Sequence, residues 1–213
     1  MVFEKHSELE GLHAFLSPSQ YHWIHDTEED LRKRYFNSQI TEMGTKLHEY
    51  AHTAIELGRL QPRNHDTVNM FINDAISFGM NSEQPLFYSW HCFGTADAIV
   101  FRKNTLRIHD LKTGLTKAHF EQLRVYAALF CLEYQRIVHR LRQEGMSDID
   151  IASKLDITPK ELHFDPLQMN GIILRIYQFN KIEEEVADTE EIRALMDIIV
   201  ADNAIIRNIK AEG

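Results

Sequence analysis

Cysteine, proline and glycine are all scarce in this chain of 213 residues, which contains 2 cysteines, 5 prolines and 9 glycines. Cys92 and Cys131 form no CxxC motif, and two thiols are too few for an iron–sulfur site or a disulfide framework. No run approaches the roughly 20 apolar residues that a membrane span needs. The N-terminal segment MVFEKHSELEGLHAF also lacks the apolar core of a signal peptide. We therefore expect a cytoplasmic protein with reduced thiols and no membrane partner.

Basic residues are outnumbered, with 23 Lys and Arg against 32 Asp and Glu and a formal net charge of -9. This balance argues against a protein that simply coats nucleic acid, because phosphate contacts come from Lys and Arg. It does not exclude an enzyme that acts on DNA, since a local basic surface can flank an acidic metal site. No Walker-type Gly-Lys-Ser/Thr segment is present, so any unwinding activity would belong to a separate helicase.

The composition is that of an ordinary globular protein, with 44% hydrophobic and 26% charged residues. The length suits a single domain over residues 1–213, with a small helical insertion at about 144–166. Residues 8–35 predict a short helical or irregular lead-in, with a helix start at Ser17-Pro18-Ser19. Apolar periodicity predicts helices at 40–59, 66–79, 117–143 and 188–209, and strands at 86–93, 96–101, 106–111 and 171–179.

This order of elements predicts an α/β fold, a central mixed β-sheet flanked by helices. The first three strands should form an antiparallel meander, with a turn at Lys103-Asn104. The aromatic run that contains Phe87, Tyr88, Trp90 and Phe93 favours core packing over base stacking. The acidic run 183–185 favours a solvated face or a helix start.

The segment 145–162 is similar to the first half of a helix-turn-helix. Ser147 and Thr158 are natural N-caps, and Pro159 suits a first helical turn. Ile151, Ala152 and Leu155 would form its buried side. Because the segment is acidic where DNA contact would need basic groups, we favour a structural insertion over a DNA-reading element.

Two carboxylates and a lysine stand out in the middle of the chain, which reads GTADAIVFRKNTLRIHDLKTG. If the two strands pair through the turn between them, Asp97 and Asp110 converge. Alternate residues of a strand share a face, so Asp110 and Lys112 point the same way. Two hard carboxylates suit Mg²⁺ or Mn²⁺. A lysine beside the ion can orient or deprotonate an attacking water.

This pattern resembles the PD-(D/E)XK nuclease superfamily in its RecB-like exonuclease branch. The resemblance is carried by Gly94-x-x-Asp97, by Asp110-Leu111-Lys112-Thr113-Gly114 and by Gln122-x-x-x-Tyr126 on the next helix. It implies that Asp97, Asp110 and the Leu111 carbonyl hold one or two metal ions and that Lys112 is the catalytic lysine. It also implies that Gln122 and Tyr126, which share a helix face, position the water or the DNA.

The branch has an upstream helix with the pattern Gly-x-x-x-His-x-x-x-Glu, and Gly44-Thr45-Lys46-Leu47-His48 matches its first half. The resemblance implies that His48 is a further metal ligand. The position of the family's glutamate holds His52, and Glu49 and Glu56 are its acidic neighbours. The basic residues near the motifs in sequence are either phosphate contacts or plain surface: Arg102, Lys103, Arg107, Lys117 and Arg124.

An alternative interpretation starts from His48-Glu49-Tyr50-Ala51-His52, a literal HExxH of the kind that binds zinc in metallopeptidases. A third ligand would have to come from Glu83, His65 or Asp74. This interpretation leaves the Asp97, Asp110 and Lys112 pattern without a role.

The resemblance implies a Mg²⁺- or Mn²⁺-dependent deoxyribonuclease, an exonuclease that acts on DNA ends in recombination, repair or phage genome processing. We expect it in the cytoplasm of a bacterial or phage-infected cell, with DNA as its partner and with a separate helicase or recombination protein beside it. A zinc metallopeptidase and a catalytically silent DNA-binding module on the same fold are the alternatives.

Overall fold

The computed structural model describes residues 14–212, so residues 8–13 of the expected lead-in lie outside the described part. The chain divides into two compact units, Met1–Lys46 and Leu47–Gly213. In the first unit, the 3₁₀ helix η2 (Pro18–His25) follows Ser17, and Trp23 Nε1 donates a hydrogen bond to the Ser17 carbonyl at 3.0 Å. The helix start expected at this point is therefore confirmed.

Helix α1 (Glu28–Glu56) begins in the first unit and ends in the second. Its start is capped by Thr27, whose Oγ1 accepts the Asp30 N–H while Asp30 Oδ2 accepts the Thr27 N–H. The helix expected at 40–59 lies almost wholly within α1, which begins well before it. The capping pair explains the earlier start, since it stabilises a polar first turn that has no apolar periodicity.

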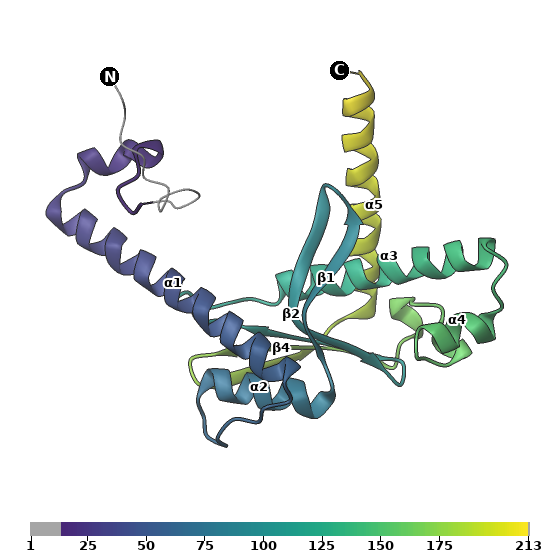
Figure 1. Ribbon diagram of the computed structural model, residues 1–213. Helices are drawn as coiled ribbons and strands as arrows, with labels where there is room; N and C mark the ends of the chain where they lie inside the picture. Colours follow the sequence, from purple (N-terminus) through teal and green to yellow (C-terminus); the bar gives the residue numbers. More distant parts are fainter. Residues whose placement is uncertain (1–13, 213) are drawn as a thin grey trace, which may run out of the picture. The chain divides into compact units, whose positions relative to one another are not determined.

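The second unit is built on a five-stranded sheet in the order β1-β2-β3-β4-β5 (Figure 1). Neighbouring strands are antiparallel except β3 and β4, which are parallel. The expected central mixed sheet and the expected antiparallel meander are thus confirmed. The strands are β1 (Asn81–Ser89), β2 (Cys92–Arg102), β3 (Thr105–Leu111), β4 (Gly171–Gln178) and β5 (Lys181–Val186).

Helices cover both faces of this sheet. Helices α3 (Glu121–Gln143) and α5 (Thr189–Glu212) lie on one face, over a core that includes Leu86, Ile99, Leu106, Ile108, Leu123, Phe130, Leu174 and Ile192. Helix α2 (Thr67–Phe78) and the last turns of α1 lie on the other face, where the core includes Ala51, Ile55, Phe71, Ile72, Ala98, Leu111 and Tyr177.

Turn chemistry sets the strand boundaries. Lys103 and Asn104 both have positive φ, 53° and 56°, which is the geometry of a two-residue hairpin turn. The strand expected at 86–93 is confirmed over 86–89, but its continuation to 93 is wrong, because the chain turns at Trp90 and His91 between β1 and β2. No glycine or asparagine marks this turn. A hydrogen bond from the His91 N–H to Ser89 Oγ stabilises it instead.

The glutamates 183–185 lie in β5, neither in a helix start nor on a wholly solvated face. Arg175 pairs with Glu184, and Arg124 makes a two-pronged ion pair with Glu185 at 2.9 and 3.0 Å. β5 is therefore a charged strand, and it lies at the edge of the sheet. Charged side chains are typical of edge strands, because they discourage pairing with another chain.

The segment 145–162, for which we favoured a structural insertion, contains a single α-helix and no second helix of a helix-turn-helix. Ser147 caps α4 (Asp148–Lys154) as expected, but the second helix is only the short 3₁₀ turn η3 (Pro159–Glu161), followed by η4 (Pro166–Gln168). Glu161 is buried and accepts hydrogen bonds from the Thr158 and Asn104 N–H groups, so it fixes the turn against the β2–β3 hairpin. None of the helices in residues 14–212 combines the length and the apolar character that a membrane span requires.

Candidate metal centre

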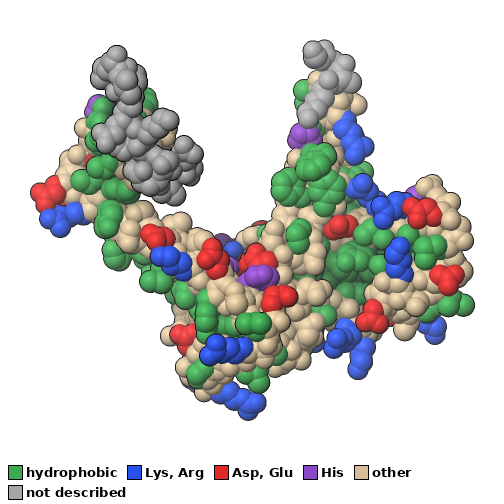
Figure 2. Space-filling view, in the orientation of Figure 1, with side chains coloured by type: hydrophobic (Ala, Val, Ile, Leu, Met, Phe, Trp, Pro, Cys, Tyr) green, Lys and Arg blue, Asp and Glu red, His purple; other side chains and the backbone are tan. Residues whose placement is uncertain are grey.

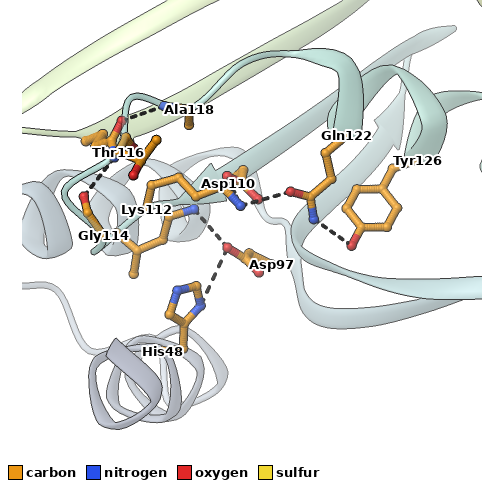
Figure 3. Close-up of polar contacts among 11 residues, drawn as sticks. His48, Asp97, Asp110, Lys112, Gly114, Thr116, Ala118, Gln122 and Tyr126 are labelled. Atoms are coloured by element: carbon orange, nitrogen blue, oxygen red, sulfur yellow. Dashed lines mark hydrogen bonds and ion pairs between the residues drawn. The ribbon is translucent and has the colours of Figure 1, made fainter. Parts of the chain in front are cut away.

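Strand pairing brings the two aspartates together where the end of β3 lies beside the middle of β2. Ala98 of β2 pairs with His109 of β3, so Asp97 and Asp110 face each other one residue further along. Asp97 Oδ2 accepts a hydrogen bond from the Leu111 N–H at 2.8 Å, which holds the carboxylate against the end of β3. Figure 3 shows these side chains converging with those of His48, Lys112, Gln122 and Tyr126.

A group with potential metal-ligand atoms lies at the same place. One ligand atom from each of His48, Glu83 and Asp97 lies within 4.8 Å of the others. His48 Nδ1 is 3.6 Å from Asp97 Oδ2. Glu83 lies in β1 with a positive φ of 49°, next to the Ser82–Ala98 pair of the β1–β2 hairpin. Sequence reasoning considered Glu83 only as a third zinc ligand and missed its place beside Asp97.

Lys112 is held on two sides. Its Nζ lies 3.1 Å from Asp110 Oδ2 and donates a hydrogen bond to Gln122 Oε1 at 2.9 Å. Gln122 Nε2 in turn donates to the hydroxyl of Tyr126 at 3.1 Å. The Lys112 backbone N–H donates to the Tyr177 carbonyl at 2.9 Å, which extends the β3–β4 pairing by one residue. The ammonium group is therefore fixed at the aspartate pair and does not extend freely into solvent.

The loop that follows Lys112 is held by a residue that sequence reasoning did not identify. Gln178 Nε2 donates to the carbonyls of Gly114 and Thr116 at 2.9 and 2.8 Å, and Gln178 Oε1 accepts the Ala118 N–H at 3.0 Å. No local signal marks Gln178, because its role depends on the parallel β3–β4 pairing between segments far apart in the sequence.

Burial changes the acidity of both aspartates. Burial, with the nearby Glu83 charge, raises the pKa of Asp97 from 3.8 to about 6, although the Leu111 N–H opposes this rise. Burial and the Asp97 charge raise the pKa of Asp110 from 3.8 to about 6, against the effect of Lys112. Burial also raises the pKa of Tyr126. Two buried carboxylates side by side repel each other, and a cation between them would relieve that repulsion.

Gly94 is the point at which the β1–β2 hairpin touches α3. A Cβ atom at Gly94 would lie 2.9 Å from Tyr126 Cε1 and 3.5 Å from its hydroxyl. Only glycine therefore lets the strand approach this tyrosine so closely, and the Gly94 and Tyr126 motifs meet in space.

We expect Gly94→Ala to displace the Tyr126 ring and weaken its contact with Gln122. Overpacking of this kind costs about 1–3 kcal/mol, which should lower the melting temperature by several degrees. Gly171→Ala is the matched control, because a Cβ there meets no atom within 4 Å. A Gly94→Ala variant that melts with the wild type would contradict the proposed contact.

Part of the expected site lies elsewhere. His52 Nδ1 is 3.0 Å from Ser82 Oγ and does not belong to the His48 group, and Glu49 and Glu56 are exposed. Arg124 is paired with Glu185 and Glu191, and Lys117 lies 3.5 Å from Glu183, so neither is a free phosphate contact. The structure brings the remaining expected site residues together: His48, Asp97, Asp110, Leu111, Lys112, Gln122 and Tyr126.

Fold and site together define an α/β protein with a buried carboxylate–lysine centre and an adjoining group of metal-ligand type. Residues 19–143, more than half of the chain, match the family described as "Protein of unknown function (DUF2800)", and the chain belongs to this family. The matched segment contains His48, Glu83, Asp97, Lys112 and Tyr126. No curated protein and no solved structure matches the chain.

Proposed function

We propose that the protein is a divalent-metal-dependent DNA nuclease of the PD-(D/E)XK type, in the RecB-like exonuclease branch. The observation that carries this proposal is the convergence of Asp97, Asp110 and Lys112 where the end of β3 lies beside the middle of β2. The Lys112 ammonium lies 3.1 Å from Asp110 and 2.9 Å from Gln122. The motifs that suggested the resemblance are thus close in space as well as ordered in sequence.

The residues present fit a divalent cation. His48, Glu83 and Asp97 offer one nitrogen and two carboxylate ligands within 4.8 Å of one another. Asp110 Oδ2 is buried without a well-formed hydrogen bond, and its close contact is the ion pair with Lys112. Oxygen-rich sets of this kind suit Mg²⁺ or Mn²⁺. When bound, such an ion supplies Lewis-acid stabilisation of the charge on the scissile phosphate.

The chain's own residues then have distinct tasks. The Lys112 ammonium orients the attacking water through its remaining N–H groups and balances the negative charge that develops on phosphorus. Gln122 holds that ammonium in place, and the Tyr126 hydroxyl holds Gln122. Because Gly94 packs against Tyr126, this positioning depends on the β1–β2 hairpin as well as on α3.

The test compares linear DNA with covalently closed circular DNA, each with Mg²⁺, with Mn²⁺ and with EDTA. We expect metal-dependent loss of linear DNA from its ends and an intact circle. Cutting of the circle would contradict the exonuclease assignment but not the nuclease. No cutting of either DNA with both metals would contradict the enzyme and leave a DNA-binding module on the same fold.

A further inference from the structure

The tip of the β1–β2 hairpin carries exposed aromatic side chains. Trp90 is 83% exposed, Phe93 63% and Phe87 36%, so the expectation that these residues pack in the core is wrong. Phe87 pairs with Phe93 across the hairpin, which places both rings on one face. Trp90 meets the Phe87 ring edge-on, with ring centroids 5.5 Å apart. We call Phe87, Trp90 and Phe93 the hairpin aromatics.

The hairpin is held in place despite its exposed surface. Ser89 Oγ at the turn donates a hydrogen bond to Asn203 Oδ1 of α5, and Arg136 of α3 donates to the Tyr88 carbonyl. The Arg136 guanidinium also lies over the Tyr88 ring, 5.2 Å from its centroid. Figure 1 shows the hairpin beside α5. The aromatic rings are therefore displayed on a supported strand pair, which lowers the entropy lost when a ligand binds them.

The same hairpin leads directly to the metal centre. Phe93 and Asp97 both belong to β2 and are four residues apart along it. At about 3.3 Å per residue, Phe93 lies roughly 13 Å from Asp97 along the strand. The rise along the axis of B-DNA is about 3.4 Å per phosphate of one strand, and an extended single strand is more widely spaced, so this distance corresponds to at most about four nucleotides. A strand whose phosphate is at Asp97 would reach the hairpin aromatics with bases only a few positions away.

Basic side chains flank the aromatic surface. A shallow pocket of about 480 Å³ is lined by Phe87, Glu133, Arg136, Ile137 and Arg140. Arg136 and Arg140 are both exposed. Figure 2 shows hydrophobic side chains on the hairpin and on α5, with basic side chains close by. Aromatic platforms beside cations are typical of sites that bind single-stranded nucleic acid through base stacking and phosphate contacts.

We propose that the hairpin aromatics stack on unpaired bases of the DNA strand whose backbone enters the metal centre. This inference rests on the proposed nuclease function and names its substrate as DNA with a single-stranded segment. A second copy of the chain is the less favoured occupant. Three aromatic side chains bury at most about 250 Å² each, whereas a stable interface needs about 800 Å² from each partner.

Tryptophan fluorescence tests the proposal directly, because Trp90 and Trp23 are the chain's 2 tryptophans. The full chain with Trp23→Phe leaves Trp90 as the single reporter. This variant is titrated with a short oligothymidylate in EDTA. A second variant, which carries both Trp23→Phe and Asp110→Asn, is titrated in Mg²⁺. We expect saturable quenching of Trp90. Trp90→Ala and Trp90→Leu, measured by fluorescence anisotropy of a labelled oligonucleotide, should each weaken binding about tenfold or more.

Trp90→Leu separates stacking from a general apolar contact, because leucine keeps apolar surface but lacks a ring. The matched control is Ile149→Ala on α4, which removes another exposed apolar side chain (73% exposed) and should leave binding unchanged. Light scattering of each variant reports the oligomeric state. Wild-type affinity in Trp90→Leu would overturn the proposal, as would loss of a dimer in Trp90→Ala without loss of DNA binding.

The two proposals fail in different ways. Metal-dependent cleavage of linear DNA without Trp90 quenching in either buffer would overturn the stacking role and leave the nuclease. Quenching by the oligonucleotide without cleavage by the wild type in Mg²⁺ or Mn²⁺ would support the stacking surface and overturn the nuclease.

Discussion

Replacement of Lys112 by alanine is expected to lower cleavage of linear DNA about a thousandfold, within the range that a positioned proton-transfer or charge-stabilising group supplies. Lys112 Nζ lies 3.1 Å from Asp110 Oδ2 and 2.9 Å from Gln122 Oε1, so alanine removes the ammonium that is paired with this carboxylate. The measurement is the initial rate on linear DNA at saturating Mg²⁺, together with the melting temperature to establish that the variant is folded.

Two matched variants serve as controls for this result. Lys117→Ala removes a lysine of the same region that is 64% exposed and lies near Glu183, and it should keep activity within a few-fold of the wild type. His52→Ala removes the second histidine of the HExxH pattern and should also stay active as a nuclease. A zinc peptidase would give the opposite pattern, in which His52→Ala is inactive and Lys112→Ala is active. A Lys112→Ala rate within tenfold of the wild type would contradict the catalytic role.

Asp110→Asn is expected to abolish nuclease activity and, at the same time, to stabilise the metal-free protein. The raised pKa of Asp110, about 6 against an ordinary 3.8, means that the ionised form is less favourable in the folded chain than in the unfolded chain. One pKa unit corresponds to about 1.4 kcal/mol. The neutral amide should therefore raise the free energy of unfolding by roughly 2 kcal/mol after allowance for the lost Lys112 ion pair.

The size of this effect depends on pH. Below pH 3.8 the Asp110 carboxyl is protonated in both the folded and the unfolded chain, so its raised pKa does not change the free energy of unfolding. Between 3.8 and about 6 the folded state binds more protons than the unfolded state, so the wild type loses stability as the pH rises. Above a pH of about 6 the wild type has lost the whole of this contribution to its stability. The stabilisation by Asp110→Asn should thus be largest at neutral pH and should vanish as the pH falls towards 4.

Thermal unfolding in EDTA measures this prediction, and about 2 kcal/mol corresponds to a rise of roughly 4–8 °C for a chain of this size. Addition of Mn²⁺ should raise the melting temperature of the wild type, because a ligand that binds only the folded state stabilises it. The same addition should have a smaller effect on Asp110→Asn. Asp148→Asn is the control, since that carboxyl is exposed and its pKa is lowered by Arg142. A variant that is less stable than the wild type in EDTA at neutral pH would refute the burial argument.

The sequence determined the type and order of most elements, because periodicity and turn chemistry are local properties. The Lys103-Asn104 turn, the Ser147 cap and the apolar stripe of α3 each follow from neighbouring residues. The exceptions have a common cause. The turn at Trp90 and His91 has a local hydrogen bond but is also held through Ser89 by Asn203, and β5 is held by Arg124; these partners are distant in sequence, so local patterns do not reveal them.

For the site, local patterns were enough to identify the candidate chemical groups: the Asp97, Asp110 and Lys112 pattern and its neighbours on two helices. Which of these groups meet depends on how the strands pair and the helices pack. Strand pairing added Glu83 beside Asp97 and Gln178 beside the loop after Lys112, and it left His52 on Ser82. Hairpin formation also leaves Phe87, Trp90 and Phe93 of an aromatic run exposed, because α3 and α5 contact the hairpin through Arg136 and Asn203 and no described element covers these three rings.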